Sequence, residues 1–179
     1  MGYGWEGEKV RLVPLDREKH FANALLWMND PVVTERTLMG DWPLGRLAEE
    51  EFFNERLRSK GTDTEIAFAL ETLDGEHIGF AGIHRIDWRH GVGQTGTLIG
   101  RRDLWGQGYG YDAVRTRLRY AFDVLGLRLL LSEVFADNTA SLKMLYKAGY
   151  KEAGRIPRRY WKRGAYRDVV LLVAERDVL

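Results

Sequence analysis

Polar and apolar residues alternate over residues 8–14, which predicts a short first strand. The spacing then becomes helical, and a helix is predicted from Asp16, which can cap it, to about Met28. A second amphipathic helix is predicted over residues 46–59, with Gly61 as its stop. The chain therefore begins with a strand followed by two helices.

Alternation returns after this helix, and residues 66–70 read as a half-buried strand. The pair Asp74-Gly75 predicts a hairpin turn into a partner strand. Within that partner, Gly79 and Gly82 indicate a bulge or a close approach of another chain segment. A further strand is expected near residues 94–100, so this region predicts antiparallel sheet.

A long helical stripe of apolar residues follows Gly108, and Gly126 ends it. Beyond it we expect a buried strand at 129–135, a helix capped by Asn138 or Thr139 and ending at Gly149, and two strands at 150–157 and 165–174 around a Lys162-Arg163-Gly164 turn. No repeat or linker interrupts the pattern. We predict one domain of mixed α/β structure over residues 1–179, with 1–7 as a flexible tail.

Composition narrows the class of protein. The 179 residues are 45% hydrophobic and 30% charged, which is typical of a globular chain. The absence of cysteine excludes disulfides, a thiolate zinc site and a cysteine nucleophile. No apolar run approaches the ~20 residues of a membrane span, and the start lacks a signal peptide. We expect a soluble, cytoplasmic protein that does not contact a membrane.

The net charge of +1 conceals an asymmetry. Residues 30–76 hold 12 acidic and 5 basic side chains, a balance of −7, whereas residues 155–167 hold 6 basic side chains and no acidic one. The acidic stretch favours a cationic ligand, and the basic stretch an anion; both also fit ordinary solvated faces. The low total charge argues against a nucleic-acid partner.

The turn Trp105-Gly106-Gln107-Gly108-Tyr109-Gly110 lies between a predicted strand and the long helix. Glycine amides and a helix N-terminus can together bind phosphate, although such a turn can also simply connect two elements. The turn lacks the Lys-Ser/Thr of a P-loop and the third glycine of the dinucleotide fingerprint. Phosphate binding and a plain connection both remain open from the turn alone.

Several motifs in one order resemble the GNAT superfamily of N-acetyltransferases, in particular the branch that acetylates ribosomal-protein N-termini and polyamines. They are Trp27-Met28-Asn29-Asp30-Pro31, the run from Ile99 to Gly110, Ala136-Asp137-Asn138-Thr139-Ala140-Ser141, Leu145 to Tyr150, Gly154-Arg155 and Gly164-x-Tyr166-x-Asp168. The family's Gln/Arg-x-x-Gly-x-Gly/Ala signature falls on Trp105-x-x-Gly108-x-Gly110, with Trp in its first position.

The resemblance implies a twisted, mostly antiparallel sheet of six to seven strands flanked by about four helices. It also implies acetyl-CoA as co-substrate, with no metal. The coenzyme-binding positions that it implies are Leu98, Ile99, Gly100, Arg102, Gln107, Gly108, Tyr109, Gly110, Asn138 and Ser141. A strand amide near Gly100 would stabilise the oxyanion.

Tyr146 matches the family tyrosine that protonates the leaving thiolate, although its spacing also fits a packed core aromatic. The position of the usual general base is Gln94, which cannot accept a proton. Either Glu35 or Glu65 acts through water, or the amine arrives neutral and water accepts the proton. The sequence leaves these alternatives open.

The resemblance implies direct transfer of an acetyl group to a primary amine, which could belong to a protein N-terminus, a polyamine, an amino sugar or an aminoglycoside. The alternative is a noncatalytic acyl-CoA-binding module. Candidate contacts to the acceptor are Trp27, Glu35, Trp42 and Gln94, and the tryptophans equally suit core or rim packing. The four histidines lack metal-ligand spacing. A homodimer through a sheet edge is compatible with the sequence.

Overall fold

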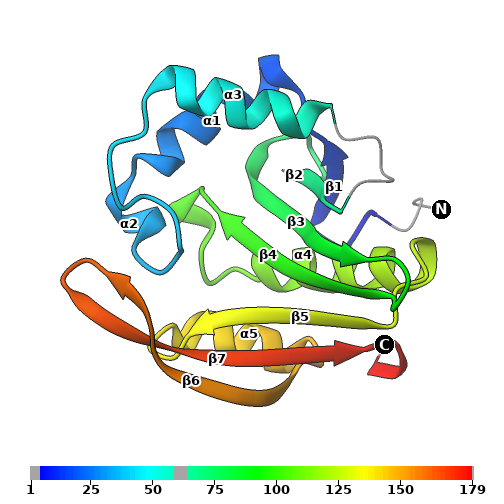
Figure 1. Cartoon of the computed structure of the whole chain (residues 1–179). Helices are drawn as coiled ribbons and strands as arrows, with labels where there is room; N and C mark the ends of the chain where they lie inside the picture. Colours follow the sequence, from blue (N-terminus) through cyan, green and yellow to red (C-terminus); the bar gives the residue numbers. More distant parts are fainter. Residues whose placement is uncertain (1–4, 59–63, 179) are drawn as a thin grey trace.

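Seven strands in the described part of the chain form one sheet (Figure 1). The computed structural model describes residues 5–58 and 64–178. The strands are β1 (Val10–Pro14), β2 (Ile66–Thr72), β3 (His77–Asp87), β4 (Val92–Ile99), β5 (Leu129–Phe135), β6 (Lys151–Lys162) and β7 (Ala165–Glu175). The helices are α1 (Arg17–Met28), α2 (Pro31–Thr34), α3 (Arg46–Leu57), α4 (Tyr109–Arg119) and α5 (Thr139–Lys147).

The strand order is β1-β2-β3-β4-β5-β7-β6. All neighbouring pairs are antiparallel except β4 and β5, which are parallel and paired only from Val92–Leu129 to Gln94–Leu131. Beyond Gln94 the two strands diverge, as Figure 1 shows at their far ends. The mixed α/β fold with a mostly antiparallel sheet is therefore confirmed.

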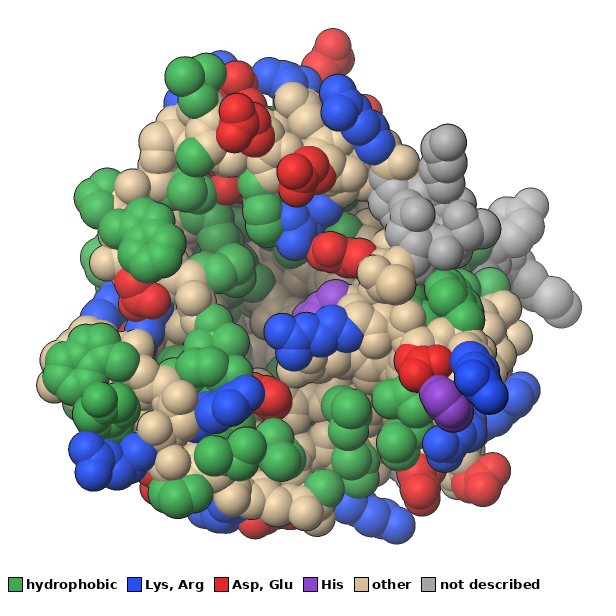
Figure 2. All heavy atoms as spheres, viewed as in Figure 1, with side chains coloured by type: hydrophobic (Ala, Val, Ile, Leu, Met, Phe, Trp, Pro, Cys, Tyr) green, Lys and Arg blue, Asp and Glu red, His purple; other side chains and the backbone are tan. Residues whose placement is uncertain are grey.

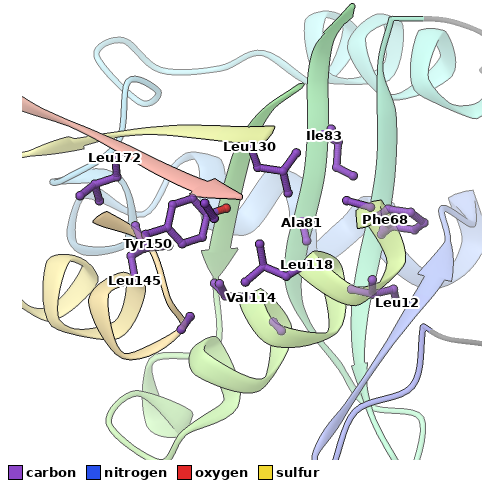
Figure 3. Close-up of a cluster of buried hydrophobic side chains, with 14 of the residues drawn as sticks. Leu12, Phe68, Ala81, Ile83, Val114, Leu118, Leu130, Leu145, Tyr150 and Leu172 are labelled. Carbon is purple, nitrogen blue, oxygen red and sulfur yellow. The ribbon is translucent and has the colours of Figure 1, made fainter. Parts of the chain in front are cut away.

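The main core lies between the sheet and helices α4 and α5 (Figure 3). Leu118 of α4 and Leu145 of α5 pack toward side chains that alternate along the strands, including Ile83 and Leu130. Helices α1 and α3 cover the other part of the sheet through smaller apolar clusters, one of them formed by Phe21, Ala24 and Phe53. Two layers of helices thus enclose the sheet.

Most of the helices and strands predicted from the sequence are present in the structure. Asp16 caps α1 by accepting from the Lys19 amide at 3.0 Å. Two details differ. The short helix α2 was not predicted; it forms because Asp30 caps it and Pro31 occupies its first turn. Strand β6 runs to Lys162, past the expected end at residue 157, because it pairs with β7 up to the turn.

The N-terminal segment is held against α4. Both carboxylate oxygens of the buried Asp112 accept hydrogen bonds from the amides of Glu8, Lys9 and Val10, at 2.8–3.1 Å. The Leu12 amide donates to the Trp5 carbonyl at 2.8 Å. Residues 1–4 of the predicted tail, like the predicted stop at Gly61, lie outside the described residues.

Within the described ranges, no helix has the length and apolar character needed to cross a membrane. The same residues contain no group of three or more His, Asp or Glu side chains arranged to hold a metal ion.

Candidate active site

The divergence of β4 from β5 adjoins a cavity of about 850 Å³. One wall comes from α2, α3 and the loop between them, and the floor comes from β2 to β5. The opposite wall comes from the glycine-rich turn before α4 and the first turns of α5. Figure 2 shows a hollow on the face of the molecule, bordered by hydrophobic, acidic and basic side chains. Its size is typical of a small-molecule site.

The glycine-rich turn leaves helix amides unpaired. Gly106 and Gly108 have φ angles of 74° and 88°, in the left-handed region that favours glycine. No side chain caps α4, and its first internal hydrogen bond runs from the Asp112 amide to the Gly108 carbonyl. The amides of the first turn are therefore free of helical partners, and they point where the helix dipole favours an anion.

Lys9 adds a positive charge to this turn. Its Nζ donates to the Gln107 carbonyl at 3.1 Å and lies 5.3 Å from the centre of the Tyr109 ring. Sequence reasoning missed Lys9 because 98 positions separate it from Gln107. Only the packing of β1 beside α4, which Asp112 fixes, brings the two together.

The expected coenzyme residues divide into two groups. Six line the cavity: Leu98, Ile99, Gly108, Gly110, Asn138 and Ser141. The other four do not line it: Gly100, Arg102, Gln107 and Tyr109. Arg102 lies 3.5 Å from the Asp30 carboxylate, and Gln107 donates to the Asp103 carbonyl at 2.6 Å. Asn138 caps α5 by accepting from the Ser141 amide at 3.2 Å, so it has the capping role while it faces the cavity.

The hydrogen bonding at the end of β4 explains why Gly100 does not line the cavity. Its amide donates to the Ile78 carbonyl at 2.9 Å and is not available to an oxyanion. Successive amides of a strand point to opposite sides, so those of Thr97 and Ile99 point away from β3, toward the divergence. The indole of Trp105, which occupies the family's Gln/Arg position, donates to the Ile99 carbonyl at 2.8 Å.

Tyr146 does not line the cavity. Its hydroxyl donates to Glu152 at 3.0 Å, and Arg155 binds the same carboxylate. Partial desolvation, followed by the hydrogen bond to the Glu152 carboxylate, raises the pKa of the Tyr146 phenol. In this arrangement the hydroxyl is engaged on the side of β6.

Of the four residues expected to contact the acceptor, two line the cavity and two do not. Glu35 and Gln94 line the cavity, but neither Trp27 nor Trp42 does. Trp27 is a core residue, because its indole packs against the backbone of Gly100 and against His77 and Phe80. Trp42 is largely exposed outside the cavity.

A carboxylate that sequence reasoning overlooked lies in the wall formed by α3. Glu49 is 2% exposed and lines the cavity, and burial raises the pKa of its carboxyl group. In the sequence it is one of three consecutive glutamates, and only tertiary packing distinguishes it from the half-buried Glu50 and the exposed Glu51. Glu65 also lines the cavity but forms an ion pair with Arg56 at 2.9 Å.

This sheet, with its diverging parallel pair and a glycine-rich turn at the start of α4, agrees with a comparison of families. The acetyltransferase (GNAT) domain matches residues 9–151. The chain therefore belongs to the GNAT acetyltransferase family.

Two relatives are described as uncharacterised N-acetyltransferases. One is p20 of Bacillus licheniformis, 33% identical over 98 residues, which are 55% of this chain and 54% of the relative. The other is YoaA of Bacillus subtilis, 29% identical over 104 residues, which are 58% of each chain. The alignments thus span little more than half the length of these relatives.

Solved structures share the fold. The spermidine N-acetyltransferase of Vibrio cholerae, in complex with CoA and spermine, superposes with a TM-score of 0.85 and 18% identity, over 94% of this chain and 96% of that one. An acetyltransferase of the GNAT family from Bacillus anthracis superposes with a TM-score of 0.81 and 14% identity, over 96% and 98%.

Proposed function

We propose that the protein transfers an acetyl group from acetyl-CoA directly to a primary amine. The observation that carries the proposal is the continuous cavity. It joins an uncapped helix N-terminus, suited to phosphate, to a wall that holds the carboxylates of Glu35 and Glu49. A coenzyme can lie at one end and an amine at the other, with the strand divergence between them.

In this proposal the turn at Gly108 and the first amides of α4 bind the pyrophosphate, and Lys9 adds charge. The pantetheine arm follows the free edge of β4 along Leu98 and Ile99, toward Asn138 at the start of α5. Family membership and the V. cholerae complex with CoA support this assignment. The thioester is the activated group that the coenzyme supplies.

The chemistry is an attack of the neutral amine nitrogen on the thioester carbonyl. The N–C bond forms, the oxyanion accepts a hydrogen bond from the Thr97 or Ile99 amide, and the C–S bond then breaks. The nitrogen loses one proton, directly or through water, to a carboxylate of the cavity. Glu49 is the candidate that burial favours, because its raised pKa makes it a stronger base than an exposed carboxylate.

We also propose that Tyr146 protonates the departing thiolate. This role requires the phenol to leave Glu152 and rotate toward the cavity. Residues 1–179 are proposed to act as a single domain.

Acidic side chains at the acceptor end favour an amine, and polyamines and protein N-termini remain candidate acceptors. The spermidine N-acetyltransferase of similar fold supports the polyamine option. The alternative function is a module that binds acyl-CoA without turnover, which the neutral Gln94 favours.

The proposal is tested by incubating the protein with acetyl-CoA and a panel of polyamines, aminoglycosides, amino sugars, amino acids and peptides, and measuring free thiol. Calorimetry with CoA gives the affinity separately. We expect thiol release with at least one amine, and an affinity for CoA about tenfold lower or more in Gly108→Val, whose φ of 88° a branched side chain does not tolerate.

Gly154→Val is the matched control, because nothing lies within 4 Å of its added Cβ. Binding of CoA without release of thiol on any amine would favour the noncatalytic alternative. Failure to bind CoA at all would contradict both functions.

A further inference from the structure

Arg117 places a buried cation at the cavity. The residue lies on α4, is 1% exposed and lines the cavity beside β4. Its Nη1 donates to the Gly96 carbonyl and to the Thr97 hydroxyl, each at 2.5 Å, while Nε is buried without a hydrogen-bond partner. Within residues 5–58 and 64–178, no carboxylate forms an ion pair with it.

A guanidinium in this position has an unmet electrostatic requirement. Arginine keeps its charge in proteins, and a buried charge is stabilised by an opposite charge or by a full set of hydrogen bonds. A carbonyl and a hydroxyl orient the Arg117 side chain but leave it without a counter-charge. The rigid fork of donors in arginine matches the two oxygens of a carboxylate.

The neighbouring charges do not compensate it. Burial lowers the pKa of His84, and the positive charges of Arg117, Arg85 and Arg56 contribute in the same direction, against Glu65. Arg56 has Glu65 as its partner, but Arg85 donates to the neutral amide oxygen of Gln94 at 3.2 Å.

Arg85 also has an unusual backbone. Its φ of 50° falls in the left-handed region at the irregularity where β3 and β4 shift register. Strained non-glycine residues of this kind concentrate at functional sites. Arg85 is exposed and does not itself line the cavity, but its partner Gln94 does, so a second guanidinium with a neutral partner lies beside the cavity that holds Arg117.

We propose that Arg117 forms a carboxylate-binding subsite inside the acyl-transfer cavity, assisted by Arg85 at its edge. The inference rests on the proposed function and narrows its substrate class to one that carries a carboxylate. Two sources share this chemistry. The carboxylate belongs either to the acceptor, as in an amino acid, or to the acyl group, as in succinyl-CoA. An amino acid would also present its amine to Glu49 in the same cavity.

The experiment separates the sources in two arms. In the first, thiol release from acetyl-CoA is compared between amino acids and their carboxamides, across a range of pH so that the different amine pKa values do not decide the result. In the second, succinyl-CoA is compared with acetyl-CoA on a carboxylate-free amine. We expect kcat/KM to favour the carboxylate about ten- to a hundredfold in one arm, the range for a charge-assisted hydrogen-bonded pair.

Arg117→Met should abolish that preference, and Arg117→Lys should keep part of it, since lysine retains the charge without the fork. Arg119→Met is the matched control, because Arg119 is exposed on the same helix and donates to the Glu6 carbonyl. Melting curves report whether each variant folds. If Arg117→Met does not fold, the wild-type ratio of acid to amide still decides the question.

A binding measurement without turnover distinguishes failure of the subsite from failure of the proposed function. The probes are succinate and succinamide, titrated calorimetrically into the CoA-saturated protein. Turnover without carboxylate preference in either arm overturns the subsite and leaves acetyl transfer in place. If no donor and amine pair turns over, the proposed function fails; equal binding of succinate and succinamide then overturns the subsite as well, and selective binding of succinate supports it.

Discussion

The hydroxyl of Tyr146 meets a carboxylate that holds its proton in place. The phenol donates to Glu152, and desolvation with this hydrogen bond raises the phenol's pKa. In the proposed role of general acid, a weaker acid that must first rotate would give only a modest catalytic advantage. We expect Tyr146→Phe to lower kcat about ten- to a hundredfold, at the lower end of general-acid effects.

Glu152→Gln is the companion variant, because it removes the charge that retains the phenol without removing the phenol. Its kcat should equal or exceed that of the wild type. An unchanged kcat in Tyr146→Phe, under conditions where the chemical step limits the rate, would show that the thiolate is protonated by another group.

At Glu49 the expected effect is on stability as a function of pH. Burial raises the folded-state pKa above the ordinary value of 4.5, so the folded protein holds this proton more tightly than the unfolded chain. Stability from this group is therefore present at low pH and is lost as pH rises through the folded pKa. The Tm of Glu49→Gln minus the Tm of the wild type should therefore increase from about pH 4 to pH 7.

Glu51→Gln, at an exposed position of the same helix, should show no such trend. A relative Tm of Glu49→Gln that does not change with pH would mean that the buried carboxylate is as well solvated as an exposed one.

Among the elements, the contact between the end of β4 and α1 depends on a missing side chain. A Cβ on Gly100 would lie 1.9 Å from Trp27 Cδ2. Gly100→Ala should therefore lower the free energy of unfolding by about 1–3 kcal/mol, or more if the indole cannot move. Denaturant titration measures the change, and Gly154→Ala on β6, with no atom within 4 Å of the new methyl group, should stay close to wild type.

His77, the first residue of strand β3, forms a hydrogen bond with helix α1 and must stay neutral in the folded protein. Asn23 Nδ2 donates to His77 Nδ1, and His77 Nε2 donates to the Gly79 carbonyl, both at 3.0 Å. Burial, with the charge of neighbouring His20, lowers the pKa of His77 from 6.5 to about 4. Since the unfolded chain binds this proton more readily, stability present above pH 6.5 is lost as pH falls toward 4.

Between about pH 7 and pH 5, the Tm of His77→Gln should therefore fall less than the Tm of the wild type, although at pH 7 the variant has the lower Tm. The control is His90→Gln, at an exposed position, whose Tm should depend on pH as the wild-type Tm does. An identical loss of Tm in His77→Gln and wild type would show that protonation of His77 does not oppose folding.

On the scale of the whole molecule, periodicity predicted the elements well because the apolar stripes face the main core or one of the smaller apolar clusters. It missed α2, whose four residues are too short to show a period. The glycine-rich turn was found from its local pattern. Lys9, Glu49 and Arg117 were not, because their placement at the cavity depends on packing between distant segments.

The two charged stretches meet in the fold. Lys162 is buried and lies 2.7 Å from Asp41, and Arg163 donates to the Pro31 carbonyl at 2.6 Å. Part of the basic stretch therefore holds the loop that begins the acidic one. The sequence allowed this stretch to bind an anion, whereas the side chains of Lys162 and Arg163 are engaged within the chain.

The position of β7 between β5 and β6 has a consequence during synthesis on the ribosome. Strands β5 and β6 precede β7 in the chain, but they are not neighbours in the sheet. Neither can complete its pairing until β7 is available between them. Until residues 165–175 leave the exit tunnel, β5 presents an unpaired edge rich in leucine, a feature that promotes aggregation. The nascent chain should therefore need a chaperone most in the interval before β7 appears.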